Sequence, residues 1–291
     1  MNIPNNYLHE LILLDPTLND IINQKDYIQF RNQMPNYLSD AYEKKFLKLN
    51  QKYINILQHK KNQTMYDRLL NIDLNEYLKT IYFDDRYFPL SHLDNIFTTF
   101  ITEINSKESN YHFNGIKSYK DYIDRLKNLK SISKSIILFL KKGLKKKITI
   151  PQCIVRSIIE QNQDILNNNT HENKFNHYQK IPPSIQKEFL NSIQSCLIQS
   201  VIDINDFLIN EYIPNCRTTI GLCHIKNGTK YYNDIINFYT SKKYTPQQIH
   251  QLGYIEMNKN LKHLSDLKTK MNFHGEFNLF ISEMKNKYNL N

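Results

Sequence analysis

The sequence is poor in the features that mark secreted and membrane proteins. Its four cysteines show no paired spacing, so no disulfide framework is indicated and free thiols are expected. Residues 1–20 lack a charged segment followed by an apolar core. The apolar runs Leu11–Leu14 and Ile136–Leu140 are far shorter than the roughly 20 residues that a membrane span needs. We therefore expect a cytoplasmic protein with no membrane segment.

Glycine and proline are also scarce, with six and nine residues in a chain of 291. This scarcity, together with long patterns of apolar residues at steps of three and four, predicts an all-α protein, mainly a large antiparallel helical array. The content of 40% hydrophobic residues argues against general disorder. We expect one helical region over 1–291, with a flexible loop at about 167–183 that is rich in asparagine and histidine.

Motifs of the common catalytic sites are missing. There is no Gly-rich phosphate loop, no Gly-x-Ser-x-Gly elbow and no aromatic signature of RNA binding. The HExxH motif of zinc peptidases needs a histidine where the two His-Glu dipeptides of this chain have Leu13 and Phe175. His171, Glu172 and His177 lie in the predicted loop, where no helix fixes their spacing. The sequence therefore predicts neither a catalytic set nor a metal site.

The densest structural signals lie in Arg217–Met257. Thr245 is a good helix N-cap, Pro246 suits the first helical position, and Gln248 completes a capping box. A mid-helix glycine costs about 1 kcal/mol relative to alanine, so we expect another backbone to approach closely at Gly253. Gly253 belongs to the apolar stripe of this helix. The stripe consists of Ile249, Gly253, Met257, Leu261, Leu264, Leu267 and Met271.

The segment before this helix has two interpretations. Asn227-Gly228 is typical of tight turns, and it separates Ile220–Ile225 from Lys230–Phe238. The two runs could pair as a short β-hairpin near 220–232. The second run also fits a helix, in which case the segment is a loop between two helices. We favour the hairpin.

His250 lies beside the apolar stripe of the capped helix. The residues three and four positions further along are Gly253 and Tyr254, so the histidine pair of a zinc-binding helix is missing. We expect His250 either to pack and hydrogen-bond within the protein or to face a substrate, and not to bind a metal.

One basic run is concentrated in a chain of net charge +10. It ends a predicted helix that begins near Ser118, where positive charge suits the helix dipole. Such a run can bind nucleic acid or another anionic surface, but a solvated loop is the commoner case, and we expect only weak, non-specific association. The run contains Lys141, Lys142, Lys145, Lys146 and Lys147.

Several short motifs follow one another in a fixed order along nearly the whole chain. The first are Asp15-Pro16, the Y-x-x-R-L element at 122–126 and the basic loop 142–155. The C-terminal ones are Tyr212-Ile213-Pro214, Arg217, Thr219, Gly221-Leu222, Asn227-Gly228, Tyr231-Tyr232, Thr245-Pro246 and Ile249-His250-x-x-Gly253. The order of these motifs resembles the domain-of-unknown-function-885 family. Its members are mostly bacterial proteins similar to HExxH zinc peptidases of the gluzincin type.

The resemblance implies a helical lobe without the metal site. Family members are about twice as long, and their HE-x-x-x-GH element lies in a second half that has no counterpart here. Zinc is therefore implied only for that half, and we expect this chain to hold no cofactor and to be inactive alone. Arg217 would meet a substrate carboxylate, or would instead tie loops together. The candidate family-motif residues are Arg217, Gly221, Gly228, Tyr231, Tyr232, His250 and Gly253.

Three functions remain open at this point. The first is one lobe of a gluzincin-like zinc peptidase, with a peptide as substrate and a partner chain that carries the catalytic half. The second is a non-enzymatic binding or scaffold module that retains the helical lobe. The third is non-specific binding of nucleic acid or an anionic surface. The coding sequence after Asn291 discriminates among them, because an HE-x-x-x-GH motif there favours the first.

Overall fold

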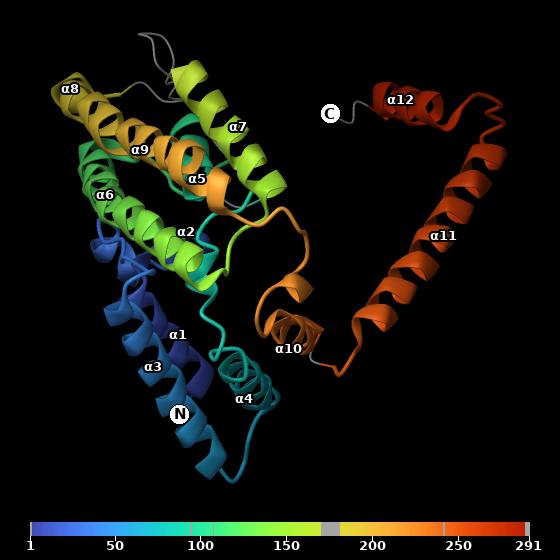
Figure 1. Cartoon of the computed structure of the whole chain (residues 1–291), viewed down its shortest axis with the longest axis horizontal. Coiled ribbons are helices and arrows are strands. Elements are labelled where there is room, and N and C mark those ends of the chain that lie inside the picture. The colour runs from blue at the N-terminus through green and yellow to red at the C-terminus, as the bar shows by residue number, and fades with distance from the viewer. Residues whose placement is uncertain (1, 94, 107, 170–180, 241, 289–291) are drawn as a thin grey trace. The chain divides into compact units, whose positions relative to one another are not determined.

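The computed structural model describes residues 2–93, 95–106, 108–169, 181–240 and 242–288. The described residues contain helices and no strand, which confirms the all-α prediction (Figure 1). The chain divides into two compact units, 1–232 and 233–291. That 1–291 forms one helical region resembling half of a longer protein stays a prediction.

Twelve α-helices are described. They are α1 Ile3–Leu14, α2 Asn19–Ile22, α3 Asp40–His59, α4 Met65–Leu78, α5 Ile96–Asn105, α6 Gly115–Lys146, α7 Gln152–Asn169, α8 Pro183–Ser192, α9 Gln199–Phe207, α10 Gly228–Thr240, α11 Pro246–Lys270 and α12 Phe277–Tyr288. Two π-helical segments, Ile193–Ile198 and Leu208–Tyr212, extend α8 and α9. Short 3-10 segments cover Pro16–Leu18, Lys25–Phe30, Asp85–Tyr87, Ile213–Asn215 and Leu222–His224.

The larger hydrophobic core of unit 1 is built around α6. This helix packs against α8, the π-helical segment 193–198 and α9, and α9 also packs against α7 (Figure 1). Its apolar residues recur at steps of three and four, so one face enters the core. The fully buried members of that face include Tyr122, Leu126, Leu129, Ile132 and Ile136.

A second, smaller core lies among α1, α3 and α4, which contact one another. Ser39 caps α3, and Thr64 with Asp67 forms a reciprocal capping box at α4, so both helices begin at well-satisfied positions. The buried residues of this core are Ile3, Leu49, Tyr53, Ile54, Leu57 and Leu74.

The β-hairpin predicted near 220–232 is wrong. A hairpin turn of type I′ needs positive φ at both central residues, but only Asn227 has it, at 62°. The Asn227 carbonyl instead accepts from the Tyr231 amide at 2.9 Å, which begins α10. Asn227-Gly228 is therefore a helix N-terminus, and the segment joins helices as in the alternative interpretation.

Unit 2 contains α11 and α12. The predicted capping box is confirmed, since the Gln248 amide donates to the Thr245 hydroxyl at 3.2 Å and the Thr245 amide donates to the Gln248 side chain at 2.8 Å. Within unit 2, nothing described lies within 4 Å of where a Cβ on Gly253 would be, and the close approach of another backbone there stays a prediction. In α12, Phe280 is buried against Phe273, with ring centroids 5.3 Å apart.

Most of the predicted loop at about 167–183 lies outside the described residues. Helix α7 continues to Asn169, and α8 begins at Pro183. His171, Glu172 and His177 lie outside the described residues. Within the described ranges, no helix is long and apolar enough to cross a membrane. A cytoplasmic location stays a prediction.

Candidate functional site

A cavity of about 710 Å³ lies within unit 1. Helices α3 and α4 of the smaller core and α5 and α6 of the larger core all contribute to its wall, as do the segments that precede α2 and follow α4. A volume of several hundred Å³ between two packed layers is typical of small-molecule sites. We therefore take this cavity as the candidate functional site.

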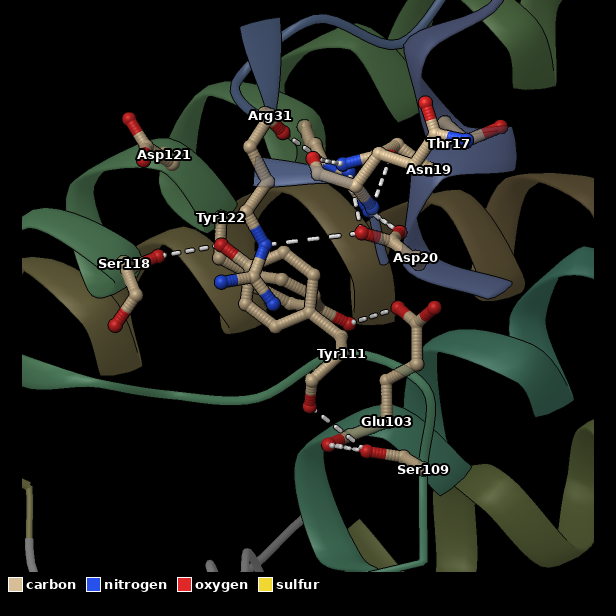
Figure 2. Close-up of polar contacts among 12 residues, drawn as sticks. Thr17, Asn19, Asp20, Arg31, Glu103, Ser109, Tyr111, Ser118, Asp121 and Tyr122 are labelled. Carbon is tan, nitrogen blue, oxygen red and sulfur yellow. Dashed lines mark hydrogen bonds and ion pairs between the residues drawn. The ribbon is translucent and has the colours of Figure 1, made fainter. Parts of the chain in front are cut away.

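A buried ion-pair network forms one part of the cavity wall. The Arg125 guanidinium pairs with both carboxylate oxygens of Asp20, and its Nε donates to the Arg31 carbonyl at 2.6 Å. Arg31 adds a second cation to Asp20, with Nε and Oδ1 3.7 Å apart (Figure 2). The side chains of Arg125 and Asp20 are only 2% and 7% exposed, so this pairing is shielded from water and salt.

An aromatic layer supports the two arginines. The Arg31 guanidinium lies 3.8 Å from the centroid of the Tyr111 ring and that of Arg125 lies 4.8 Å from it, both within cation–π range. The Tyr111 hydroxyl donates to the Ser118 carbonyl at 2.6 Å, which fixes the ring. Tyr111 also meets Tyr122 edge to face, with centroids 4.7 Å apart. The layer holds both guanidinium groups in place.

Glu103 is the carboxylate of this cluster with the fewest partners. Its Oε2 accepts from the Tyr122 hydroxyl at 2.9 Å (Figure 2), and within the described ranges no cation lies close enough for an ion pair. Burial raises the pKa of Glu103 above its usual range, and the nearby Arg125 and the Tyr122 hydrogen bond only partly oppose this. Glu103 lines the cavity and has no ion-pair partner among the described residues, although Arg125 and Arg31 lie near enough to oppose the rise of its pKa.

A second group of charges lines the cavity near the 3-10 segment Asp85–Tyr87. Arg86 Nε lies 2.8 Å from Asp84, and its Nη1 lies 2.7 Å from Asp40 and 2.8 Å from Glu43. Burial raises the pKa of Asp85, and the adjacent Asp84 adds to that rise. Asp85 accepts from the Tyr231 hydroxyl at 3.4 Å. Arg86 is thus surrounded by carboxylates, whereas Asp85 has a neutral partner.

The structure places Arg217 away from this cavity wall. Its Nε donates to the Thr149 carbonyl, and its Nη1 donates to the carbonyls of Thr219 and Gly221, each at 2.7 Å. Its own carbonyl accepts from the Gln152 amide at 2.8 Å. This geometry fits the alternative in which Arg217 ties loops together. A substrate role for Arg217 stays a prediction.

The other motif residues of unit 1 have mixed environments. Gly221 has φ of 81°, which favours glycine. A Cβ on Gly228 would lie 1.8 Å from the Leu222 carbonyl oxygen, so this site requires glycine. Tyr231 is buried and its ring stacks on Phe83 with centroids 4.0 Å apart, whereas Tyr232 is 46% exposed. Of the two tyrosines, Tyr232 is the one available to a ligand.

His250 and Gly253 lie on α11, in unit 2. Both are exposed, and the His250 ring meets the Tyr254 ring edge to face at 5.3 Å. No three His, Cys, Asp or Glu side chains in the described part of the chain are grouped as metal ligands require. The residues present therefore do not fit a zinc site, and we assign none here.

The predicted basic patch is partly engaged within the protein. Lys141 Nζ lies 3.1 Å from a Glu211 carboxylate oxygen, and Lys146 Nζ donates to the Tyr87 hydroxyl at 2.5 Å. Lys142 Nζ lies 4.3 Å from the centroid of the Phe139 ring. Lys145 and Lys147 are exposed at the end of α6. Weak association with an anionic surface stays a prediction.

Sequence reasoning missed Asp20, Glu103 and Arg125 as site residues. One signal was present, because the Y-x-x-R-L element puts Arg125 on the apolar face of a helix, three residues after Tyr122. An arginine on a buried face requires a buried anionic partner. The identity of this partner could not be predicted from the residues near Arg125, since Asp20 lies 105 positions away in the chain.

Comparisons with known proteins give a family and a fold. No curated protein matches the chain. The crystal structure of the "putative lipoprotein" from Colwellia psychrerythraea is similar in fold, with a TM-score of 0.64 and 14% sequence identity over 85% of this chain. The match spans 46% of that protein's chain. The family model described as "bacterial protein of unknown function (DUF885)" matches residues 22–291, so the chain belongs to this family.

Proposed function

We propose that this chain is the N-terminal helical lobe of a gluzincin-like zinc peptidase and that the zinc-binding motif is supplied by a further part of the fold. The family match over 22–291 and the order of the family motifs support this proposal. The structural match supports it as well, since 85% of this chain aligns with only 46% of the Colwellia protein. The remainder of the fold would belong to the same polypeptide or to a partner chain.

The apolar face of α11 is the observation that carries the proposal. The helix has no buried residue, and its stripe residues Met257, Leu261 and Leu267 are about half exposed, at 48%, 53% and 49%. Leu252 and Ile255 extend the exposed apolar surface. Large exposed apolar patches mark interaction sites in soluble proteins. Within unit 2, no described element covers this face.

The occupant that we propose for this face is the remainder of the peptidase fold. An α-helix with a regular apolar stripe is stabilised mainly by packing that stripe against another element. In this proposal α11 lies against the metal-bearing part, and residues 1–291 supply one wall of the substrate cleft. Tyr232, 46% exposed, is a motif residue of unit 1 that is available to a peptide substrate. Residues 1–291 alone would not turn over a peptide.

The oligomeric state of the isolated chain tests whether the apolar face of α11 is an interaction surface. We expect residues 1–291 to self-associate in size-exclusion chromatography with light scattering, because no described element of unit 2 covers the apolar face of α11. Leu261→Glu, on the stripe, should give a monomer, and Lys262→Glu, an exposed neighbour on the same helix, should not. A monomeric wild type that Leu261→Glu leaves unchanged would rule out this use of the face.

A non-enzymatic binding module is the second candidate function. The observation that favours it is the cavity of unit 1, whose lining residues all belong to that unit. A module of this kind would bind its ligand at full affinity as residues 1–291 alone. It would also gain no peptidase activity from any added polypeptide.

A further inference from the structure

We propose that the cavity of unit 1 binds an organic cation, an ammonium or guanidinium group, with Glu103 as its anionic partner. The inference goes beyond the peptidase proposal and does not depend on it. It rests on the number of acidic and basic side chains in the cavity wall, on the ion pairs that the two arginines there already make, and on the aromatic rings that line the cavity.

Carboxylates outnumber cations in the cavity wall. Five acidic side chains line the cavity, and Arg86 and Arg125 are the two basic side chains that line it. The excess of negative charge is set in a partly enclosed space, where charges are screened less than on an open surface. The acidic residues are Asp15, Asp20, Glu43, Asp85 and Glu103.

The two arginines are already neutralised by protein groups. Arg125 directs Nη1 and Nη2 to Asp20 and Nε to the Arg31 carbonyl. Arg86 is paired with Asp40, Glu43 and Asp84. Both guanidinium groups already have protein partners: Arg125 pairs with Asp20, which Arg31 shares, and Arg86 pairs with three carboxylates, so their N–H groups offer little to an anionic ligand. The cavity therefore favours a cation.

Glu103 has unused capacity for a cationic donor. A carboxylate can accept hydrogen bonds at both oxygens, and Tyr122 donates to Oε2 alone. Among the described residues no hydrogen bond reaches Oε1, and no ion pair reaches either oxygen. Burial makes the charged form costly, as the raised pKa of Glu103 reflects. A bound ammonium or guanidinium group would supply both the missing hydrogen bond and the missing charge.

The remaining wall favours an organic cation over a metal ion. Aromatic rings attract cations over their faces and cover the apolar part of an amine. Hard metal ions instead need several oxygen ligands within about 2–2.6 Å of one point. In the ranges that the structure describes, no group of three acidic, His or Cys side chains meets that need. The aromatic residues of the wall are Tyr37, Tyr42, Phe46, Tyr77, Phe88 and Phe100.

Isothermal titration calorimetry on residues 1–291 tests the proposal. The probes are agmatine and cadaverine as free cations, acetyl-Ala-Lys-Ala-amide for a basic side chain, Ala-Ala-Ala-amide for an amino terminus, and pentanol as a neutral control. We expect at least one cationic probe to bind and pentanol not to bind. Which probe binds most tightly identifies whether a free amine or a peptide group is the natural source.

Two matched variants complete the test. Glu103→Gln keeps the size of the side chain and an oxygen that accepts from Tyr122, but removes the charge. A hydrogen bond to a charged group contributes about 1.5–3 kcal/mol, so Glu103→Gln should weaken the cation roughly tenfold to a hundredfold. Glu188→Gln, an exposed position on α8, should leave binding unchanged. Equal binding by wild type and Glu103→Gln would overturn the proposal, as would failure of every cationic probe to bind or equal binding of pentanol.

The pH dependence gives a second readout. Glu103 faces Tyr122 and Arg125 from α6 and, from the N-terminal segment, Asp20 and Arg31. A cation binds the ionised carboxylate, so affinity should rise as pH rises through the raised pKa of Glu103. The rise should be absent in Glu103→Gln. A wild-type affinity that stays constant as pH rises through the pKa of Glu103, measured by its own titration, would contradict the assignment of Glu103.

Discussion

Replacing Arg125 by methionine is expected to destabilise unit 1 by about 3 kcal/mol. The substitution keeps a long apolar stem but leaves Asp20, 7% exposed, with Arg31 alone at 3.7 Å. It also removes the donor from the Arg31 carbonyl. Breaking a buried ion pair by removing one partner typically costs about 3–5 kcal/mol, and the remaining arginine puts this case at the low end.

Urea denaturation followed by far-ultraviolet circular dichroism measures this loss. In a thermal melt, the same cost of about 3 kcal/mol should lower the melting temperature of a domain of this size by roughly 6–12 °C. Lys127→Met is the control on the same helix. Lys127 pairs with Asp124 at 3.1 Å in an exposed position, so its loss should change the free energy of unfolding by less than about 0.5 kcal/mol.

A double-mutant cycle separates the ion pair from lost packing. Asp20→Asn removes the charge that Arg125→Met strands, so the double variant should be more stable than the sum of the two single losses by about 1–3 kcal/mol. The reasoning is refuted if Arg125→Met costs less than about 1 kcal/mol, or if the two substitutions are simply additive.

Three further predictions concern glycines, acid stability and salt. Gly228→Ala should destabilise the start of α10, because the added Cβ would lie 1.8 Å from the Leu222 carbonyl oxygen. Gly253→Ala on α11, where nothing lies within 4 Å of the added Cβ, should stabilise that helix by about 0.5–1 kcal/mol. Thermal melts of the two variants test both predictions. The hydrogen bonds from Lys60 and Thr64 and the charge of Lys60 lower the pKa of Asp67 from 3.8 to about 2. The stability that Asp67 contributes should therefore be fully present above pH 3.8 and be lost as pH falls through 2. In acid titration, Asp67→Asn should not show this loss of stability. Replacing the lysines of 145–147 with glutamine should abolish a weak, salt-sensitive DNA affinity, and tight, sequence-selective binding at physiological salt would contradict this.

The sequence predicted the helical architecture well where local signals decide it. The capping box of Thr245 and Gln248 marked the start of α11 correctly, because a cap depends on residues three positions apart. Helix α6 begins at Gly115 rather than at the predicted cap Ser118, since a glycine with φ of 74° allows an earlier start. Local signals thus give helix identity reliably and helix boundaries less so.

The candidate site could not be predicted from local pattern. Asp20 on α2 and Arg125 on α6 meet although they lie 105 positions apart in the chain, and no local pattern marks that contact. Glu103 belongs to α5, whose buried residues Phe97, Phe100 and Ile104 are apolar, and no sequence motif singles it out. Arg217 was singled out because it matched a motif, but its guanidinium donates to backbone carbonyls. The motif match therefore singled out this position without giving its role.

Zinc content and peptide hydrolysis test the central claim most directly. Residues 1–291 are produced alone and joined to the polypeptide encoded immediately after Asn291, in the same or the adjacent frame. Zinc per chain is measured by mass spectrometry, and turnover is measured with a fluorogenic peptide. The account predicts that residues 1–291 alone bind no stoichiometric zinc and have no turnover, and that the joined protein holds about one zinc and hydrolyses the peptide. Tight zinc binding by residues 1–291 alone, or a following polypeptide without an HE-x-x-x-GH motif, would contradict it.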